Sequence, residues 1–377
     1  MAGSPDTTYQ YGGPARARRF AALPDPFPMW RGGQLRAAQV AYETWGALSP
    51  ARDNAILLFT GLSPPAHARS SVEDPSEGWW EGMVGPGLAI DTERYFVVCV
   101  NSLGSCFGST GPASLNPATS LAYRLGFPEL SLEDIARAGF ETLRSLGIER
   151  ADTIIGPSLG GMVVLAYAAQ FHGAARRIIS ISGTAAASPF AIALRSIQRE
   201  AILRDPEWHG GAYPDEHPPV TGMRIARMLG MMTYRSAHEW IHRFGREPAT
   251  EPPQTPFAPE FAIQSYLEAH ARRFVRAFDP NCYLYISRAM DRFDLAAHGG
   301  SPHEALRPSR LEEALVIGVE SDMLFAVDEQ RQVAHALERA GARTSFAPLK
   351  CIEGHDSFLI DLQSFGREIG AFLSRTR

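Results

Sequence analysis

Short apolar runs that are rich in β-branched residues recur along this chain. They lack the alternation of apolar and polar residues that marks a half-buried strand, and they are typical of strands buried on both faces of a parallel sheet. Helical patterns separate most of the runs, so the sequence predicts an α/β fold with a doubly wound, mostly parallel sheet. The predicted strands are NAILLFT (54–60), YFVVCV (95–100), TIIG (153–156), RIISIS (177–182), ALVIGVE (314–320) and TSFAPL (344–349).

Two of the helical patterns are especially clear. The pattern over 131–148 opens with Ser131 and Asp134, a pair that suits the start of a helix. The last predicted helix repeats apolar residues at alternating spacings of four and three, which places them on one face. These residues are Phe358, Leu362, Phe365, Ile369 and Phe372.

The alternation of strands and helices stops after Ser182 and resumes near Leu311. Long helical patterns with many aromatic residues fill the interval. We therefore expect an α/β core made of residues 1–183 and 310–377, with a mainly helical lid inserted over 184–309.

The composition argues against several classes of protein. A net charge of -5 and a pI of about 6.1, with no block of like charges, give no basis for a nucleic-acid or membrane-surface partner. There is no membrane-spanning apolar stretch and no signal-peptide pattern, so we expect a soluble cytoplasmic protein. The four cysteines are widely spaced without a CxxC pair, and they predict reduced thiols rather than a metal site or disulfides.

The stretch GPSLG, residues 156–160, places Ser158 between glycines, after a predicted strand and before a helical pattern. A serine hydroxyl is a weak nucleophile, so it has to be presented on a tight turn beside a base and backbone donors. The context of this G-x-S-x-G pattern meets that need, and the helix N-terminus adds partial positive charge. The pattern alone occurs often by chance, so its partners must decide whether Ser158 is catalytic.

A serine nucleophile of this architecture needs an acid after a late strand and a histidine before the last helix, in that order. Asp322 follows the strand predicted over 314–320, and His355 lies before the last predicted helix. Each has a simpler alternative, since Asp322 could cap the helix that begins near Val327 and His355 could be structural. Their order and their positions at strand ends favour a triad of Ser158, Asp322 and His355.

The loop GLSPPAH follows the first predicted strand and offers part of an oxyanion hole. The backbone amide of Leu62 in this loop and the amide of Leu159 after the serine are the predicted donors. The alternative is that Gly61 and the prolines only shape a turn.

With these pieces located, the chain resembles the homoserine O-acyltransferase family of α/β-hydrolase proteins, which move an acyl group from acyl-CoA to an amino-acid hydroxyl. The resemblance implies an α/β-hydrolase fold, and it carries nucleophile, acid and base onto Ser158, Asp322 and His355. The segments that carry it extend over nearly the whole chain. They include VAYETWG, GLSPPAHA, GWWEGMVGPG, FVVCVNSLGSCFGSTGPASLNPAT, GPSLGGM, RMLGMMTYRS, SDMLF and GHDSFL.

Within that family the chain looks most like the serine O-succinyltransferase branch, on segments such as YRSAHEWIHRFGR and DPNCYLYISRAMDRFDL. The resemblance then implies that Arg227 binds the carboxylate of an acceptor amino acid and that Asp356 binds its ammonium group, as their charges allow. The residues alone would favour an exposed lid arginine and a helix N-cap.

The resemblance also implies two sets of specificity residues. Arg195 would discriminate among acyl-CoA donors, because a cation offsets the cost of burying the free carboxylate of a succinyl group. Its alternative role is a solvent-facing helix charge. The choice between serine and homoserine, which differ by one methylene, would be set by Gly61, Leu62, Ser63 and Pro64.

The implied reaction uses succinyl-CoA as co-substrate and L-serine as acceptor, and it needs no cofactor and no metal. The lid would exclude water, which would otherwise hydrolyse the acyl-enzyme, and a homodimer is expected. Transfer to homoserine, or transfer of acetyl, is the nearest alternative. The triad alone also permits a plain esterase or thioesterase. A third alternative is a binding or scaffold protein that uses a hydrolase fold without catalytic activity.

Overall fold

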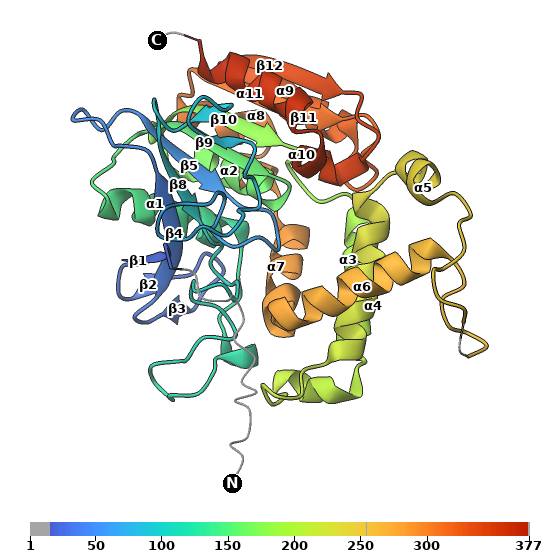
Figure 1. Cartoon of the computed structure of the whole chain (residues 1–377). Helices are drawn as coiled ribbons and strands as arrows, with labels where there is room; N and C mark the ends of the chain where they lie inside the picture. The colour runs from blue at the N-terminus through green and yellow to red at the C-terminus, as the bar shows by residue number, and fades with distance from the viewer. Residues whose placement is uncertain (1–15, 254, 376–377) are drawn as a thin grey trace.

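The computed structural model describes residues 16–253 and 255–375. Its central sheet has eight strands: β1 (Arg19–Ala22), β4 (Gln39–Trp45), β5 (Ala55–Phe59), β8 (Phe96–Val100), β9 (Ala151–Pro157), β10 (Ala175–Ile181), β11 (Glu313–Val319) and β12 (Arg343–Leu349). Their order across the sheet is β1-β4-β8-β5-β9-β10-β11-β12 (Figure 1). The pairs β1–β4 and β4–β8 are antiparallel, and the other neighbours are parallel.

Every strand predicted from the apolar runs is present, so the doubly wound, mostly parallel sheet is confirmed. The sequence does not predict β1 or β4, which antiparallel pairing adds at one edge. Two small ladders lie outside the sheet. They pair β2 (Phe27–Pro28) with β3 (Gln34–Leu35), and β6 (Val84–Gly85) with β7 (Ile90–Asp91).

The sheet has an apolar core on each face, and successive residues of a strand join different cores because they point to opposite sides. In β5, for example, Leu57 joins one apolar core and Leu58 joins the other. This double burial explains why the strands read as continuous apolar runs. The helices of the first core include α1 (Leu132–Ser145), α2 (Leu159–Gln170) and α9 (Val327–Arg339), and the second core contains α11 (Leu362–Leu373).

Ser131 caps α1 as predicted, since its Oγ accepts a hydrogen bond from the amide of Asp134 and the Asp134 carboxylate accepts one from the amide of Ser131. The prediction of one continuous last helix is wrong, because the chain breaks at Asp361 into α10 (Ser357–Ile360) and α11. Asp361 has a non-helical backbone, and its Oδ1 accepts an amide of the following turn, which starts α11 afresh. Phe358 therefore belongs to α10.

Between β10 and β11 the chain builds a mainly helical insertion. Its helices are α3 (Pro189–Leu203), α4 (Val220–Tyr234), α5 (Ala237–Phe244), α6 (Ala262–Ala277), α7 (Pro280–Arg292) and α8 (Pro302–Leu306). In Figure 1, α3, α4, α5 and α6 stand to one side of the sheet, and α3 packs against both α4 and α7. Short 3₁₀ helices are η1 (Arg124–Gly126), η2 (Pro206–Gly211), η3 (Leu295–His298), η4 (Arg307–Ser309) and η5 (Gly354–Asp356).

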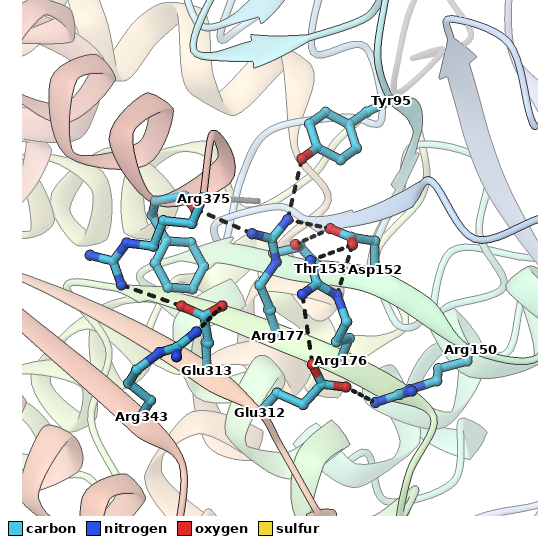
Figure 2. Close-up of polar contacts among 11 residues, drawn as sticks. Tyr95, Arg150, Asp152, Thr153, Arg176, Arg177, Glu312, Glu313, Arg343 and Arg375 are labelled. Carbon is cyan, nitrogen blue, oxygen red and sulfur yellow. Dashed lines mark hydrogen bonds and ion pairs between the residues drawn. The ribbon is translucent and has the colours of Figure 1, made fainter. Parts of the chain in front are cut away.

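Charged side chains form a network at the amino ends of β9 to β12 (Figure 2). Arg177 on β10 is fully buried, and its Nη2 donates to Asp152 Oδ2 at 2.5 Å and to the Tyr95 hydroxyl at 3.2 Å. Its Nη1 donates to the carbonyl of Phe372 at 3.2 Å. One guanidinium thus links β9, β10 and α11 at the edge of the sheet opposite the strands' carboxyl ends.

Replacing Asp152 with alanine should destabilise the protein, because it leaves the buried Arg177 guanidinium without its counter-charge. Breaking a buried ion pair in this way costs about 3–5 kcal/mol, so the midpoint of guanidinium chloride unfolding, followed by tryptophan fluorescence, should fall clearly. Arg343→Gln is the matched control, since it removes an exposed partner of Glu313 and should leave the midpoint near that of the wild type. Equal midpoints for the two variants would contradict this role of Asp152.

Candidate active site

The turn between β9 and α2 presents Ser158. Its φ of 55° and ψ of −117° are strained for a residue with a side chain. The flanking glycines make the turn possible, because a Cβ atom at Gly156 would lie 2.3 Å from the carbonyl carbon and oxygen of Gly160. The sharp strand, turn and helix expected of the G-x-S-x-G pattern are therefore present at the carboxyl end of the strand.

Ser158, His355 and Asp322 form a single hydrogen-bonded chain. Ser158 Oγ lies 2.7 Å from His355 Nε2, and His355 Nδ1 lies 2.7 Å from Asp322 Oδ2. The other carboxylate oxygen of Asp322 accepts hydrogen bonds from two backbone amides of the following turn, at 2.9 and 3.0 Å. The alternative role of Asp322 as a helix cap is wrong, because the N-cap of α9 is Ala326.

His355 is buried among aromatic rings and has a raised pKa. The ring centroids of Phe325, Tyr234 and Phe358 lie 5.2, 6.0 and 6.2 Å from that of the imidazole. Burial by itself disfavours the imidazolium, but the charge and the hydrogen bond of Asp322 outweigh it and raise the pKa of His355 above its usual value. The site therefore stabilises the cation that forms when the imidazole takes a proton from a neighbouring hydroxyl.

Two contacts that the sequence does not predict hold the loop of His355. The hydroxyl of Ser321, which precedes the acid, donates to the carbonyl of Cys351 at 2.6 Å. The buried Trp80 Nε1 donates to the carbonyl of Phe358 at 2.9 Å. Both bonds join segments that are distant in sequence, so no local pattern could have revealed them.

The amides of Leu62 and Leu159, predicted as oxyanion donors, come from two segments that touch. A Cβ atom at Gly160 would lie 2.8 Å from the carbonyl oxygen of Phe59 and 2.9 Å from that of Thr60, so the start of α2 packs against the end of β5. Within the described part of the chain, neither amide donates a hydrogen bond. Leu159 is the first residue of α2, where an amide has no acceptor in its own helix, and Leu62 lies in the loop after β5. Both amides are therefore free to donate.

Arg227 and Asp356, the predicted acceptor-binding pair, do not form an ion pair with each other. The Arg227 Cζ on α4 lies 5.7 Å from the ring centroid of Tyr234, which in turn lies beside His355. The Oδ2 of Asp356 lies 3.4 Å from Nε of Arg235, a partner that the sequence does not predict. Asp356 is the N-cap residue of α10, as the alternative expected, but its side chain makes no cap hydrogen bond.

Arg195 on α3 is only 4% exposed, so the alternative of a solvent-facing helix charge is wrong. Its Nε donates to Asp291 Oδ1 on α7 at 2.5 Å, and its buried Nη2 has no hydrogen-bond partner among the described residues. Its Cζ lies 5.9 Å from the ring centroid of Phe325, the ring that also contacts His355. The guanidinium and the imidazole therefore both lie beside the Phe325 ring.

Gly61, Leu62, Ser63 and Pro64 follow β5 and are buried or half-buried at the carboxyl end of the sheet. A Cβ atom at Gly61 would meet Pro64 Cδ at 3.7 Å, which is an ordinary contact. Close packing therefore does not demand a glycine at this position.

The described residues contain neither a cluster of metal ligands nor a helix suited to crossing a membrane. Nowhere among them do three His, Cys, Asp or Glu side chains come together as metal ligands would. Among the same residues, every helix is too short or too polar to span a bilayer. The cysteines are free thiols, with Cys99, Cys282 and Cys351 buried and Cys106 partly exposed.

Comparison with known proteins places this geometry in a family. The family model of the alpha/beta hydrolase fold matches residues 54–347. A serine O-succinyltransferase from Litchfieldella anticariensis is 56% identical over 363 residues, which cover 96% of this chain and 99% of that protein. A serine O-succinyltransferase from Stenotrophomonas maltophilia is 57% identical, over 94% of this chain and 97% of that protein.

Solved structures agree with this assignment. A homoserine O-acetyltransferase from Bacillus anthracis superposes with a TM-score of 0.87 at 27% identity, covering 95% of this chain and 98% of its own. Esterase E22 superposes with a TM-score of 0.86, also at 27% identity, over 95% of this chain and 99% of its own. The chain therefore belongs to the α/β-hydrolase family and, within it, to the homoserine O-acyltransferase family that its sequence resembles.

Proposed function

We propose that this chain is a serine O-succinyltransferase, which moves a succinyl group from succinyl-CoA to the hydroxyl of L-serine. The observation that carries the proposal is the buried Arg195 guanidinium near His355, whose free Nη2 suits an acyl group that ends in a carboxylate. The relatives named serine O-succinyltransferase, at 55%, 56% and 57% identity over nearly the whole chain, support the same activity.

Acylation begins when His355 accepts the proton of Ser158 and Oγ attacks the thioester carbonyl carbon. The amides of Leu62 and Leu159 donate to the oxyanion of the tetrahedral intermediate. As the intermediate collapses, the C–S bond breaks, His355 passes the proton to the sulfur, and CoA leaves a succinyl ester on Ser158. Asp322 orients the imidazole throughout and stabilises its cationic form.

Transfer to the acceptor uses the same groups. The hydroxyl of L-serine gives its proton to His355, and its oxygen attacks the carbonyl carbon of the succinyl ester. The oxyanion forms again between the two backbone amides. When the ester bond to Ser158 breaks, His355 returns the proton to Oγ and O-succinyl-L-serine is released, a product that would supply cysteine synthesis.

Arg227 and Asp356 hold the acceptor, since the guanidinium suits the carboxylate of L-serine and Asp356 suits its ammonium group. Arg235, the ion-pair partner of Asp356, orients the side-chain carboxylate of Asp356. The segment from Gly61 to Pro64 sets the room for the acceptor side chain. We extend the proposal to a homodimer in the cytoplasm that needs no added cofactor, with the family resemblance as support.

Two alternatives use the same triad. Homoserine as acceptor, or acetyl as the acyl group, would need only a different pocket, and a homoserine O-acetyltransferase is among the structural neighbours. A plain esterase or thioesterase would use water as acceptor, and an esterase superposes nearly as well. The identity of the acceptor and of the acyl chain separates these activities.

CoA release should be fastest with succinyl-CoA and L-serine together. The measurement follows the free thiol with succinyl-CoA or acetyl-CoA, each offered L-serine, L-homoserine or no acceptor. Ser158→Ala should lower kcat by about 10⁴-fold or more, because the nucleophile is lost. Equal release without an acceptor would identify a thioesterase, and a preference for L-homoserine or acetyl-CoA would overturn the corresponding half of the proposal.

The pH dependence should follow the titration of His355. Only the neutral imidazole accepts a proton, and Asp322 raises its pKa, so kcat/KM for succinyl-CoA should fall as pH drops through a value above the ordinary histidine pKa of about 6.5. Asp322→Asn removes the raising charge, so this acid limb should move to lower pH while kcat falls by about 10⁴-fold.

Glu320→Gln is the control for this profile, since it removes an exposed carboxyl group close to Asp322 in sequence and should leave the acid limb in place. An acid limb that does not move in Asp322→Asn would show that another group controls the reaction at low pH.

A further inference from the structure

Arg195 belongs to a larger group of charged side chains between α3 and α7. Arg195 and Arg199 lie one helical turn apart on α3, and Ser287 and Asp291 lie one turn apart on α7, so each pair shares a helix face. The two faces meet across the lid. Arg195 Nε donates to Asp291 Oδ1 at 2.5 Å, and Arg199 Nη2 lies 2.6 Å from Asp291 Oδ2.

The charges of this group do not balance. Asp291 is a single carboxylate between two guanidinium groups, and Arg199 also donates from Nη1 to the Ser287 hydroxyl at 2.9 Å. No other carboxylate in the described part of the chain forms an ion pair with either arginine. Together the three charged groups carry one uncompensated positive charge.

A further carboxyl group, Glu329 on α9, lies near enough to interact electrostatically with Arg195. Burial and the charge of Asp322 raise the pKa of Glu329, which favours its neutral form relative to an ordinary glutamate. It makes no ion pair with Arg195, so it does not take the place of Asp291 as the counter-charge.

The uncompensated charge lies where hydrogen bonding is incomplete. Side chains of Arg195 and Asp291 are 5% and 8% exposed, and Arg195 Nη2 is buried without an acceptor. An unmade hydrogen bond of a buried charged donor is costly, and a carboxylate is the acceptor that restores it best. Because Asp291 occupies Nε and no described residue accepts a hydrogen bond from Nη1 or Nη2, the outer end of the guanidinium is left for a ligand.

We propose that Asp291 and Arg199 set the donor selectivity of this enzyme without touching the substrate. Asp291 orients the Arg195 guanidinium, and Arg199 offsets the charge of Asp291, so that Arg195 keeps one full positive charge for the terminal carboxylate of a dicarboxylic acyl thioester. This inference rests on the proposed function, and it makes Asp291 and Arg199 positioning residues. Net charge at this site, rather than the presence of one arginine, then selects the donor.

The charge balance can be tested by changing it in both directions. Arg199→Gln keeps a polar side chain but lets Asp291 neutralise Arg195, so the ratio of kcat/KM for succinyl-CoA over acetyl-CoA should fall by about 10-fold or more. The loss should appear mainly in KM for succinyl-CoA. Asp291→Asn keeps an oxygen acceptor for Arg195 Nε and removes the negative charge, so the ratio should stay at the wild-type value or rise.

The double variant Arg199→Gln/Asp291→Asn is the decisive one. It removes one positive and one negative charge, so Arg195 again carries the single uncompensated charge. The donor ratio should therefore recover to within about threefold of the wild type, although two side chains of the group have changed. A purely structural contact between α3 and α7 would instead be weakened further by the second substitution.

Arg204→Gln is the matched control, because it removes a cation at the exposed end of α3 that pairs with Glu200 and not with Asp291. It should leave both donors unchanged. Activity with acetyl-CoA and the thermal unfolding midpoint check that each variant is folded. If one variant does not fold, the others still show how the loss of a positive or of a negative charge changes the donor ratio.

The outcomes separate this inference from the proposed function. A wild type with no preference for succinyl-CoA would overturn the proposed function itself. A succinyl preference that is lost in Arg195→Leu but kept in Arg199→Gln would leave that function standing and overturn the inference. Equal losses for both donors in Arg199→Gln, with no recovery in the double variant, would also overturn it.

Discussion

The convergence of parallel strands at one edge of the sheet is the constraint on which the site depends. β9, β11 and β12 end at the same edge, so the turns that follow them bring Ser158, Asp322 and His355 within hydrogen-bonding distance. The turn at Ser158 is strained, and a Cβ atom at Gly156 or Gly160, two residues before and after it, would lie within 2.9 Å of backbone atoms. A sheet buried on both faces supplies the rigidity that holds such a turn in place.

The two buried arginines in the described part of the chain, Arg177 and Arg195, show how charge pairing separates stability from binding. Arg177 lies at the amino ends of the strands, and both of its outer nitrogens donate to acceptors from Asp152, Tyr95 and Phe372, although its Nε has no partner among the described residues. Arg195 lies in the lid with one acceptor on Nε and none on Nη2. A buried guanidinium whose outer nitrogens are both bonded contributes to the fold, whereas one with an unbonded outer nitrogen keeps a place for an anion.

The sheet and the triad do not by themselves decide between transfer and hydrolysis. Homoserine O-acetyltransferase and esterase structures superpose on this chain almost equally well. What distinguishes the chemistry must therefore lie in the groups that receive the acyl chain and the acceptor. In our proposal those groups come from the inserted helices α3 and α4, which carry Arg195 and Arg227.

Much of the fold and part of the site could be predicted from the sequence, because local patterns determine them. Continuous apolar runs predict the buried strands, and the order of Ser158, Asp322 and His355 predicts their convergence. Pairings between distant residues have no such pattern: Arg195 and Asp291 are 96 positions apart, and the packing of α3 on α7 decides that they meet. Because that pairing fixes the net charge presented to the acyl chain, donor selectivity depends on the contact between two helices as much as on Arg195.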